Sequence, residues 1–288
     1  MSDYVIRSMT PEQVQTAVDW AAREGWGPGF QDASCFTATD PEGFKAGFLD
    51  GRMISSISGV NYDDSFAFMG FYIADPDYRG VGYGYELAKA ALAHCGDRNK
   101  GLDGVVEQQE NYKRYGFKLI YRNIRFAGTV AQALEALPSP PETGITHLRQ
   151  PSEALKTYDR ALFPAPRDVF LTSWLGAPGH ISRMAQDQDG ITGYATLRPC
   201  HGGFKIGPLF ADDPEIARAL LAALLAEVPD DQRGETVYLD LPEPNAEALK
   251  LAAQLGFTQV FETARMYSDH APDIDLNRIY GITSYELG

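Results

Sequence analysis

A cluster of glycines stands where the sequence pattern changes from a strand to a helix, in the segment Arg79-Gly80-Val81-Gly82-Tyr83-Gly84. An apolar run over residues 66–73 precedes it, and an amphipathic pattern over 86–92, continuing to about Cys95, follows it. Glycines let the main chain approach a ligand closely, and the free N–H groups at the start of a helix attract anions. The segment therefore predicts a cradle for a pyrophosphate group, to which Arg79 adds a charged contact. A tight turn without a ligand is the alternative.

The spacing of the glycines excludes two common nucleotide motifs. The dinucleotide pattern G-x-G-x-x-G fails because Tyr85 stands where the third glycine is needed, and no G-x-x-x-x-G-K-[ST] occurs. The residues do fit R-x-x-G-x-G, and here the sequence resembles the GNAT family of acyl-CoA-dependent N-acyltransferases. A second segment, Asn111-Tyr112-Lys113-Arg114-Tyr115-Gly116-Phe117, is similar to the GNAT signature Y-E-K-x-G-F, with Lys-Arg in place of Glu-Lys. The resemblance covers roughly residues 4–126.

The resemblance implies a cofactor, acetyl-CoA, and a reaction. The glycine turn would hold the CoA pyrophosphate, and the preceding strand would bind the pantetheine arm. Tyr112 would be the general acid that protonates the leaving thiolate, a packed aromatic residue being the alternative. A neutral amine would attack the thioester directly in a ternary complex, with a main-chain N–H near Ile73 polarising the carbonyl. The cofactor-binding residues expected on this basis are Phe71, Tyr72, Ile73, Arg79, Gly80, Val81, Gly82, Tyr83, Gly84, Asn111 and Tyr115.

An amine that arrives protonated needs a base to become a nucleophile. A strand expected over residues 102–107 would place Asp103, Val105 and Glu107 on one face. Glu107 is the favoured base or water-orienting carboxylate and Asp103 the second choice, with a solvated strand end as the alternative.

The acceptor side of the cleft is expected after the first helix, where Trp26, Phe30, Asp32 and Phe36 occur. Aromatic rings with one carboxylate suit a cationic amine, but core packing of a short helix is the favoured interpretation. The five histidines show no i,i+4 pairing and no adjacent carboxylate motif, so no metal site is predicted.

The surrounding pattern predicts an α+β fold. We expect a strand over 4–7, a helix capped by Thr10, a Gly/Pro-rich loop at 25–29 and a hairpin at Asp50-Gly51. A helix over 109–115 and closing strands over 117–126 would complete a mixed, mostly antiparallel central sheet flanked by helices.

The two halves of the 288-residue chain repeat the same landmarks in the same order. Asp50-Gly51 recurs as Asp189-Gly190, Gly70 as Gly207, and Gly116-Phe117 as Gly256-Phe257, at separations of 137 to 140 residues. A proline-rich segment, 138–144, separates the halves. We therefore predict two tandem GNAT-like domains, 1–137 (catalytic) and 145–288, joined by a linker; two unrelated halves that share turn dipeptides are the alternative.

The second half lacks the residues that carry the chemistry. The positions that match Arg79, Gly82 and Gly84 hold Ala217, Leu220 and Ala222, within a helix expected over 214–228, and Ala252 matches Tyr112. We predict a degenerate GNAT-like domain without an acyl-CoA site, whose ending at 281–288 resembles that of bacterial tandem-GNAT proteins. It could wall the acceptor cleft, form a homodimer or stabilise the fold.

Composition limits the partners. Asp and Glu outnumber Lys and Arg by 39 to 25, which disfavours nucleic acid, and no apolar run is long enough to span a membrane. Three scattered cysteines and the lack of a signal pattern predict the cytoplasm. The sequence thus predicts an N-acetyltransferase acting on a small-molecule amine or on a Lys or N-terminal amino group. The alternatives are a non-catalytic acyl-CoA-binding sensor or scaffold, and transfer of another acyl chain.

Overall fold

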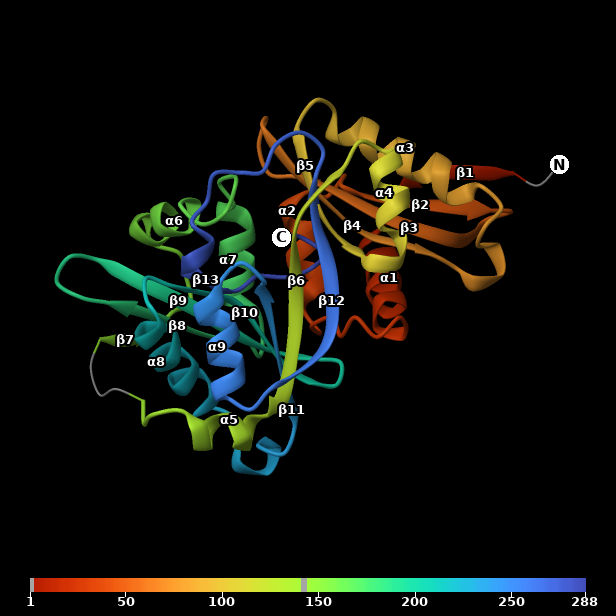
Figure 1. The fold of residues 1–288 in the computed structure, drawn as a ribbon. Coiled ribbons are helices and arrows are strands. Elements are labelled where there is room, and N and C mark those ends of the chain that lie inside the picture. Colours follow the sequence, from red (N-terminus) through yellow and green to blue (C-terminus); the bar gives the residue numbers. More distant parts are fainter. Residues whose placement is uncertain (1–2, 141–143) are drawn as a thin grey trace.

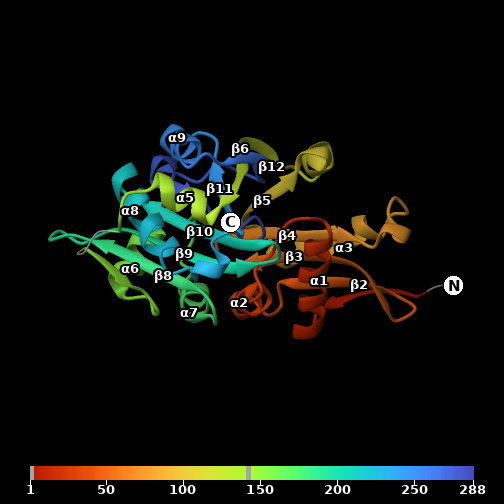
Figure 2. The same cartoon turned by 90° about the horizontal axis from the view of Figure 1, so that it is seen from below.

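The computed structural model describes residues 3–140 and 144–288, and its strands form one continuous sheet (Figures 1 and 2). The first half contains β1 (Tyr4–Ser8), α1 (Pro11–Arg23), α2 (Asp32–Thr39), β2 (Phe44–Leu49), β3 (Arg52–Asn61), β4 (Phe66–Ala74), α3 (Tyr83–Cys95), β5 (Asn99–Val105), α4 (Gln109–Arg114), β6 (Lys118–Thr129) and α5 (Val130–Ala136). Three-residue 3₁₀ turns cover Pro76–Tyr78 and Val106–Gln108.

The second half repeats this order with β7 (Ile145–His147), α6 (Glu153–Arg160), α7 (Asp168–Gly176), β8 (Ile181–Gln186), β9 (Ile191–Cys200), β10 (Gly203–Ala211), α8 (Pro214–Leu225), β11 (Thr236–Pro242), α9 (Ala246–Gln254) and β12 (Thr258–Tyr267). A short β13 (Ile279–Gly281) is added, and 3₁₀ turns cover Asp230–Gln232 and Leu276–Arg278. The repeat of elements agrees with the duplication predicted from the landmarks. Of the expected linker, residues 141–143 lie outside the described part of the chain.

Local sequence signals account for several of these elements. Thr10 caps α1 through a reciprocal capping box with Gln13. Asp50 and Gly51 both have positive φ, which is the backbone that a two-residue hairpin between β2 and β3 requires. Helices then cover both faces of the first half of the sheet. One apolar cluster holds α1 and α2 against β2 and the end of β4, while α3 packs on the opposite face.

The two halves exchange their last long strands. The strand order is β1-β2-β3-β4-β5-β12-β6-β11-β10-β9-β8-β7, with β13 paired to β10. β6 of the first half pairs with β11 of the second, and β12 of the second half pairs with β5 of the first. Figure 1 shows β6 and β12 side by side where the halves meet. Because α5 follows β6 into the core of the second half, the sequence boundary near residue 138 is not a boundary in space.

Two matching ion pairs join the exchanged strands to their new neighbours. Arg265 on β12 binds Asp103 on β5 through Nε and Nη2, at 2.9 and 2.6 Å. Arg125 on β6 binds Asp240 on β11 in the same way, at 2.6 and 2.8 Å. All four side chains are buried. The two halves therefore resemble each other in their buried ion pairs as well as in the order of their elements.

Candidate active site

The first half of the sheet opens into a slot between two parallel strands. β4 and β5 pair only as far as Met69 and Leu102 and then separate. A β-bulge lies at this point. Phe71 has a φ of +49°, the register of β4 against β3 shifts, and Ser56 Oγ donates to the Phe71 carbonyl at 2.8 Å. Before the bulge, Met69 packs on the side of α3; after it, Phe71 and Ile73 pack on the side of α1 and α2. The bulge thus redirects β4 where a ligand could enter.

A cavity of about 520 Å³ follows this slot. Eleven of the residues predicted for the cofactor, acid, base or acceptor sites line it: Trp26, Phe71, Tyr72, Ile73, Arg79, Gly80, Gly84, Asp103, Asn111, Tyr112 and Tyr115. The structure therefore brings the glycine turn and the second motif to one cavity.

The glycine turn leaves its main chain open. Gly80 and Gly82 have φ values of +79° and +98°, and no atom of the described residues lies within 4 Å of a Cβ built at either. Gly82 is the N-cap of α3, and within the described part of the chain no side chain caps the N–H groups there. These groups fit an anion such as a pyrophosphate. Val81, Gly82 and Tyr83 belong to the turn but do not line the cavity.

Arg79 lies beside the turn, within reach of solvent. Its Nε donates to the Ala74 carbonyl at 2.9 Å, and its side chain forms an ion pair with Glu24. Both Arg79 and Glu24 are substantially exposed, so the pair is weak and can open for a phosphate.

Tyr112 reaches the cavity from the β5 side of the slot. A Cβ at Gly104 of β5 would come within 2.2 Å of Tyr112 Cε2, so the glycine makes room for this ring. Partial burial raises the pKa of Tyr112 to about 12. The phenol therefore stays protonated at neutral pH and is available as a proton donor.

The two predicted bases, Glu107 and Asp103, lie in different surroundings. β5 ends at Val105, so the expected alternation does not reach Glu107, which lies on the 3₁₀ turn, exposed and outside the cavity lining. Asp103 does line the cavity, but its carboxylate is bound by Arg265 and by Asn123 Nδ2 at 2.7 Å. Asp103 is buried because β12 of the second half joins β5 and supplies Arg265 as its ion-pair partner.

The residues expected on the acceptor side of the cleft lie in different parts of the structure. Trp26 lines the cavity, whereas Asp32 is fully buried, pairs with Arg198 at 3.2 Å and accepts a hydrogen bond from Gly29 N at 2.7 Å. Phe36 is a core residue stacked on Trp174. Asp32 therefore belongs to the interface between the halves rather than to a surface that receives an amine.

The second half contributes residues that motif reasoning did not find. Phe261 and Thr263 on β12, and Tyr285 and Glu286 near the C-terminus, line the same cavity. Figures 1 and 2 both show the C-terminus where the two halves meet. A Cβ at Gly70 would lie 2.4 Å from the Glu286 carbonyl oxygen, so the tail packs directly on β4. The internal repeat was detectable in the sequence, but nothing in it indicated which half each last strand joins.

The corresponding slot of the second half is filled by the chain itself. β10 and β11 pair as far as Ile206 and Leu239 and then separate. β13 occupies this opening by pairing with β10, and Ile282 N then donates to the Asp240 carbonyl at 2.8 Å. Asp213 is the N-cap of α8, the position that Gly82 holds at α3, and its side chain accepts a hydrogen bond from Ile216 N. Leu220 lies inside α8, so the predicted match of Leu220 with Gly82 was wrong. A filled slot and a helix start that is already capped both agree with the predicted loss of an acyl-CoA site in the second half.

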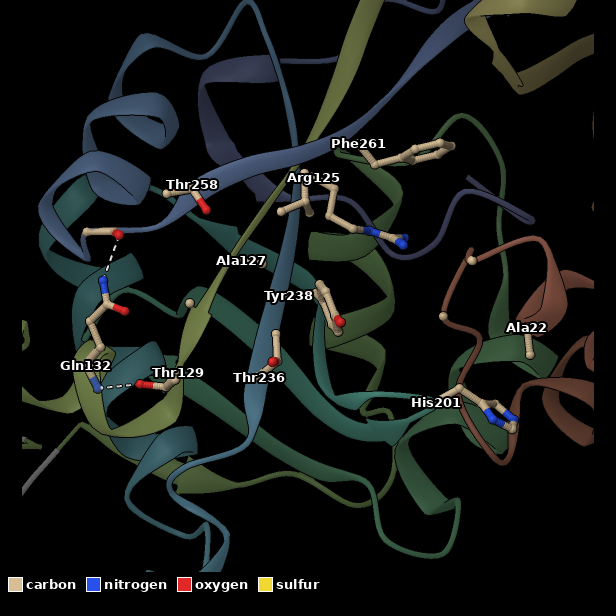
Figure 3. Close-up of a pocket in the computed structure, with 15 residues that line it drawn as sticks. Ala22, Arg125, Ala127, Thr129, Gln132, His201, Thr236, Tyr238, Thr258 and Phe261 are labelled. Carbon is tan, nitrogen blue, oxygen red and sulfur yellow. Dashed lines mark hydrogen bonds between the residues drawn. The ribbon is translucent and has the colours of Figure 1, made fainter.

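A second cavity of about 670 Å³ adjoins the first (Figure 3). Phe261 lines both, and the loop after α1 contributes Trp26 to the first and Gly25 and Gly27 to the second. Arg125, Tyr238 and His201 line it together with threonines and small residues. No carboxylate occurs in this lining, as far as residues 3–140 and 144–288 show.

Within the described ranges, no group of three or more His, Cys, Asp or Glu side chains could hold a metal ion. No helix in those ranges has the length and apolar character to cross a bilayer.

Comparisons with known proteins identify the family. Residues 11–117 match a model described as the acetyltransferase (GNAT) family, and residues 155–281 match an acetyltransferase (GNAT) domain. The holothin acyltransferase of Pseudoalteromonas sp. (strain SANK 73390) is 34% identical over 279 residues, which cover 96% of this chain and 92% of that protein.

Solved structures share the fold. An acetyltransferase candidate from Pyrococcus horikoshii superposes with a TM-score of 0.80 at 21% identity, covering 99% of this chain and 96% of that one. A tandem GNAT protein from the clavulanic acid biosynthesis pathway superposes with a TM-score of 0.65 at 15% identity, covering 92% and 98%. The chain belongs to the GNAT acyltransferase superfamily, with two GNAT domains in tandem.

Proposed function

We propose that this protein transfers an acetyl group from acetyl-CoA to a primary amine by direct attack in a ternary complex. The observation that carries the proposal is a single cavity that joins an open glycine turn, a splayed pair of strands and a tyrosine. Acyl-CoA would supply the activated thioester. The N–H groups from Gly80 to Gly84 would bind its pyrophosphate, the free edge of β4 at 71–73 would bind the pantetheine arm, and Tyr112 would donate a proton to the leaving sulfur.

We propose the second cavity as the site for the body of the acceptor. It adjoins the transfer site through Phe261 and the 24–27 loop, and it presents hydroxyl groups and aromatic rings without a carboxylate in its described lining. Such a surface favours a small, weakly charged molecule over a polycation. Since a 34%-identical relative is named as an acyltransferase of holothin, holothin is the first acceptor to test.

The alternative is a protein that binds acyl-CoA without transfer. Release of free thiol from acetyl-CoA, measured against a panel of primary amines that includes holothin, separates the two. A transferase releases thiol only when an accepted amine is present, whereas a sensor binds CoA and releases none with any amine. Repeating the assay with longer acyl chains tests the preference for acetyl. The described cysteines, Cys35, Cys95 and Cys200, are free and buried, which supports our proposal of a cytoplasmic location.

Calorimetry with CoA tests the proposed pyrophosphate site at the glycine turn independently of the transfer reaction. We expect one binding site per chain, because β13 fills the slot of the second half. Gly82→Val should weaken CoA binding about 10- to 100-fold, since valine cannot keep a φ of +98° and the N–H groups would turn away from the phosphates. Gly234→Ala is a matched control, because that glycine has open space around it and no positive φ. Two sites per chain, or unchanged binding by the Gly82 variant, would contradict the assignment.

A further inference from the structure

Glu286 carries a buried carboxylate at the cavity of the first half. It lines the 520 Å³ cavity and is 2% exposed, yet neither carboxylate oxygen has a hydrogen-bond partner in the described part of the chain. The buried carboxylates of Asp32, Asp103 and Asp240 each bind an arginine. An unpartnered carboxylate is costly to bury, and such groups concentrate at functional sites.

The charged groups around Glu286 come from both halves. Arg125 on β6, Arg198 on β9 and Lys205 on β10 favour its ionised form, while Asp32 on α2 opposes it. The two arginines are already held by Asp240 and Asp32, and Lys205 Nζ donates to the Trp26 carbonyl at 3.1 Å. Burial outweighs these attractions and raises the pKa of Glu286 above its usual value. A raised pKa makes a carboxylate a stronger base near neutral pH.

The tail holds Glu286 in a defined place beside the slot. Its main chain packs on Gly70, next to the bulge at Phe71. The neighbouring Leu287 accepts a hydrogen bond from Tyr62 Oη at 2.8 Å and donates its N–H to Ser284 Oγ at 3.1 Å. Glu286 thus adjoins β4, whereas Tyr112 packs on β5. The Glu286 main chain and the Tyr112 ring therefore lie against opposite strands of the slot, and both residues line one cavity.

We propose that Glu286, supplied by the second half of the chain, is the general base for the transfer site of the first half. This inference rests on the proposed function. The Glu286 carboxylate takes one proton from the acceptor ammonium, and the freed lone pair forms the C–N bond as the C–S bond breaks. Tyr112 gives its proton to the departing sulfur and regains one from the nitrogen. The sum is acyl-CoA plus ammonium giving amide, CoA thiol and one proton, which Glu286 returns to water.

The test compares amines that differ in protonation. Thiol release from acetyl-CoA is measured for Glu286→Gln with alkylamines, which are ammonium ions at neutral pH, and with arylamines, which are already neutral. We expect kcat/KM for alkylamines to fall about 10²-fold or more and for arylamines to change little. For alkylamines the defect should shrink as the pH approaches the pKa of the amine. The acid limb of the wild-type profile, where Glu286 becomes protonated, should be replaced in the variant by a rise in rate that follows deprotonation of the alkylamine.

Controls separate this role from a structural one. Glu110→Gln removes an exposed carboxylate paired with Lys113 and should leave the rates unchanged. Binding of CoA by calorimetry reports whether each variant is folded, and Glu286→Asp, which keeps a carboxylate, should retain part of the alkylamine activity. Equal losses with both amine classes, or loss only in Glu107→Gln, would overturn the assignment of Glu286 while the transferase stands. No thiol release by the wild type with any amine would overturn both.

Discussion

Replacing Tyr112 with phenylalanine is expected to lower kcat by about 10²- to 10⁴-fold while the affinity for CoA stays within about twofold. The ring contributes packing against Gly104, which phenylalanine preserves, and only the hydroxyl is lost. Because the pKa of Tyr112 is raised to about 12, the phenol is protonated across the assay range, and its loss removes a proton donor at every neutral pH. Steady-state thiol release and CoA calorimetry measure the two quantities separately.

Tyr115→Phe is the matched control for Tyr112→Phe. Tyr115 lies on the same motif and lines the same cavity, and its ring stacks on Tyr85 at a centroid separation of 6.0 Å. We expect its hydroxyl to affect CoA affinity more than kcat, because its neighbours belong to the glycine-turn side of the cavity. If Tyr112→Phe kept the kcat of the wild type, the sulfur would be protonated by another group, and Tyr112 would be a packing residue.

The parts of the site that depend on local sequence could be predicted. Gly82 must adopt a positive φ at the start of α3, and that requirement is visible in the residue type and its spacing. Thr10 and the Asp50-Gly51 turn carry similarly local signals for α1 and the β2–β3 hairpin. The match of Leu220 with Gly82 was wrong because α8 begins seven residues earlier, at its N-cap Asp213. The structure gives a different reason for a lost site in the second half, since β13 fills the slot beside β10.

The parts that depend on long-range pairing could not be predicted. Either half could in principle close its sheet with its own last strand, since β6 and β12 occupy equivalent positions and carry similar patterns. The exchange decides that the Asp103 carboxylate is neutralised, because it places Arg265 on Asp103, whereas the Glu286 carboxylate has no hydrogen-bond partner among the described residues. The alternation of side chains along residues 102–107 predicted that Glu107 shares a face with Asp103. That prediction assumed a strand that continues past Val105, where β5 ends.

The exchanged strands themselves predict a large loss of stability when one ion pair is broken. Asp103→Asn removes the charge from a fully buried side chain and leaves Arg265 uncompensated, for which a loss of about 3–5 kcal/mol in the free energy of unfolding is expected. Thermal unfolding should show a decrease of about 10 °C in the melting temperature, at about 2–4 °C per kcal/mol for a chain of this size. Glu247→Gln is the matched control, because its pair with Lys250 is exposed and should contribute less than about 1 kcal/mol.

A double replacement distinguishes the structural role of Asp103 from the catalytic one that its place on β5 first indicated. Asp103→Leu combined with Arg265→Met removes both charges and fills the space with apolar groups, so most of the lost stability should return. If Asp103 only joins β5 to β12, transfer activity should return with the fold, since the slot, Tyr112 and Glu286 are untouched. A double variant that regained its melting temperature but remained inactive would show instead that the Asp103 carboxylate takes part in the reaction. The strand exchange would then serve to position Asp103 as the base, and Glu286 would not be needed in that role.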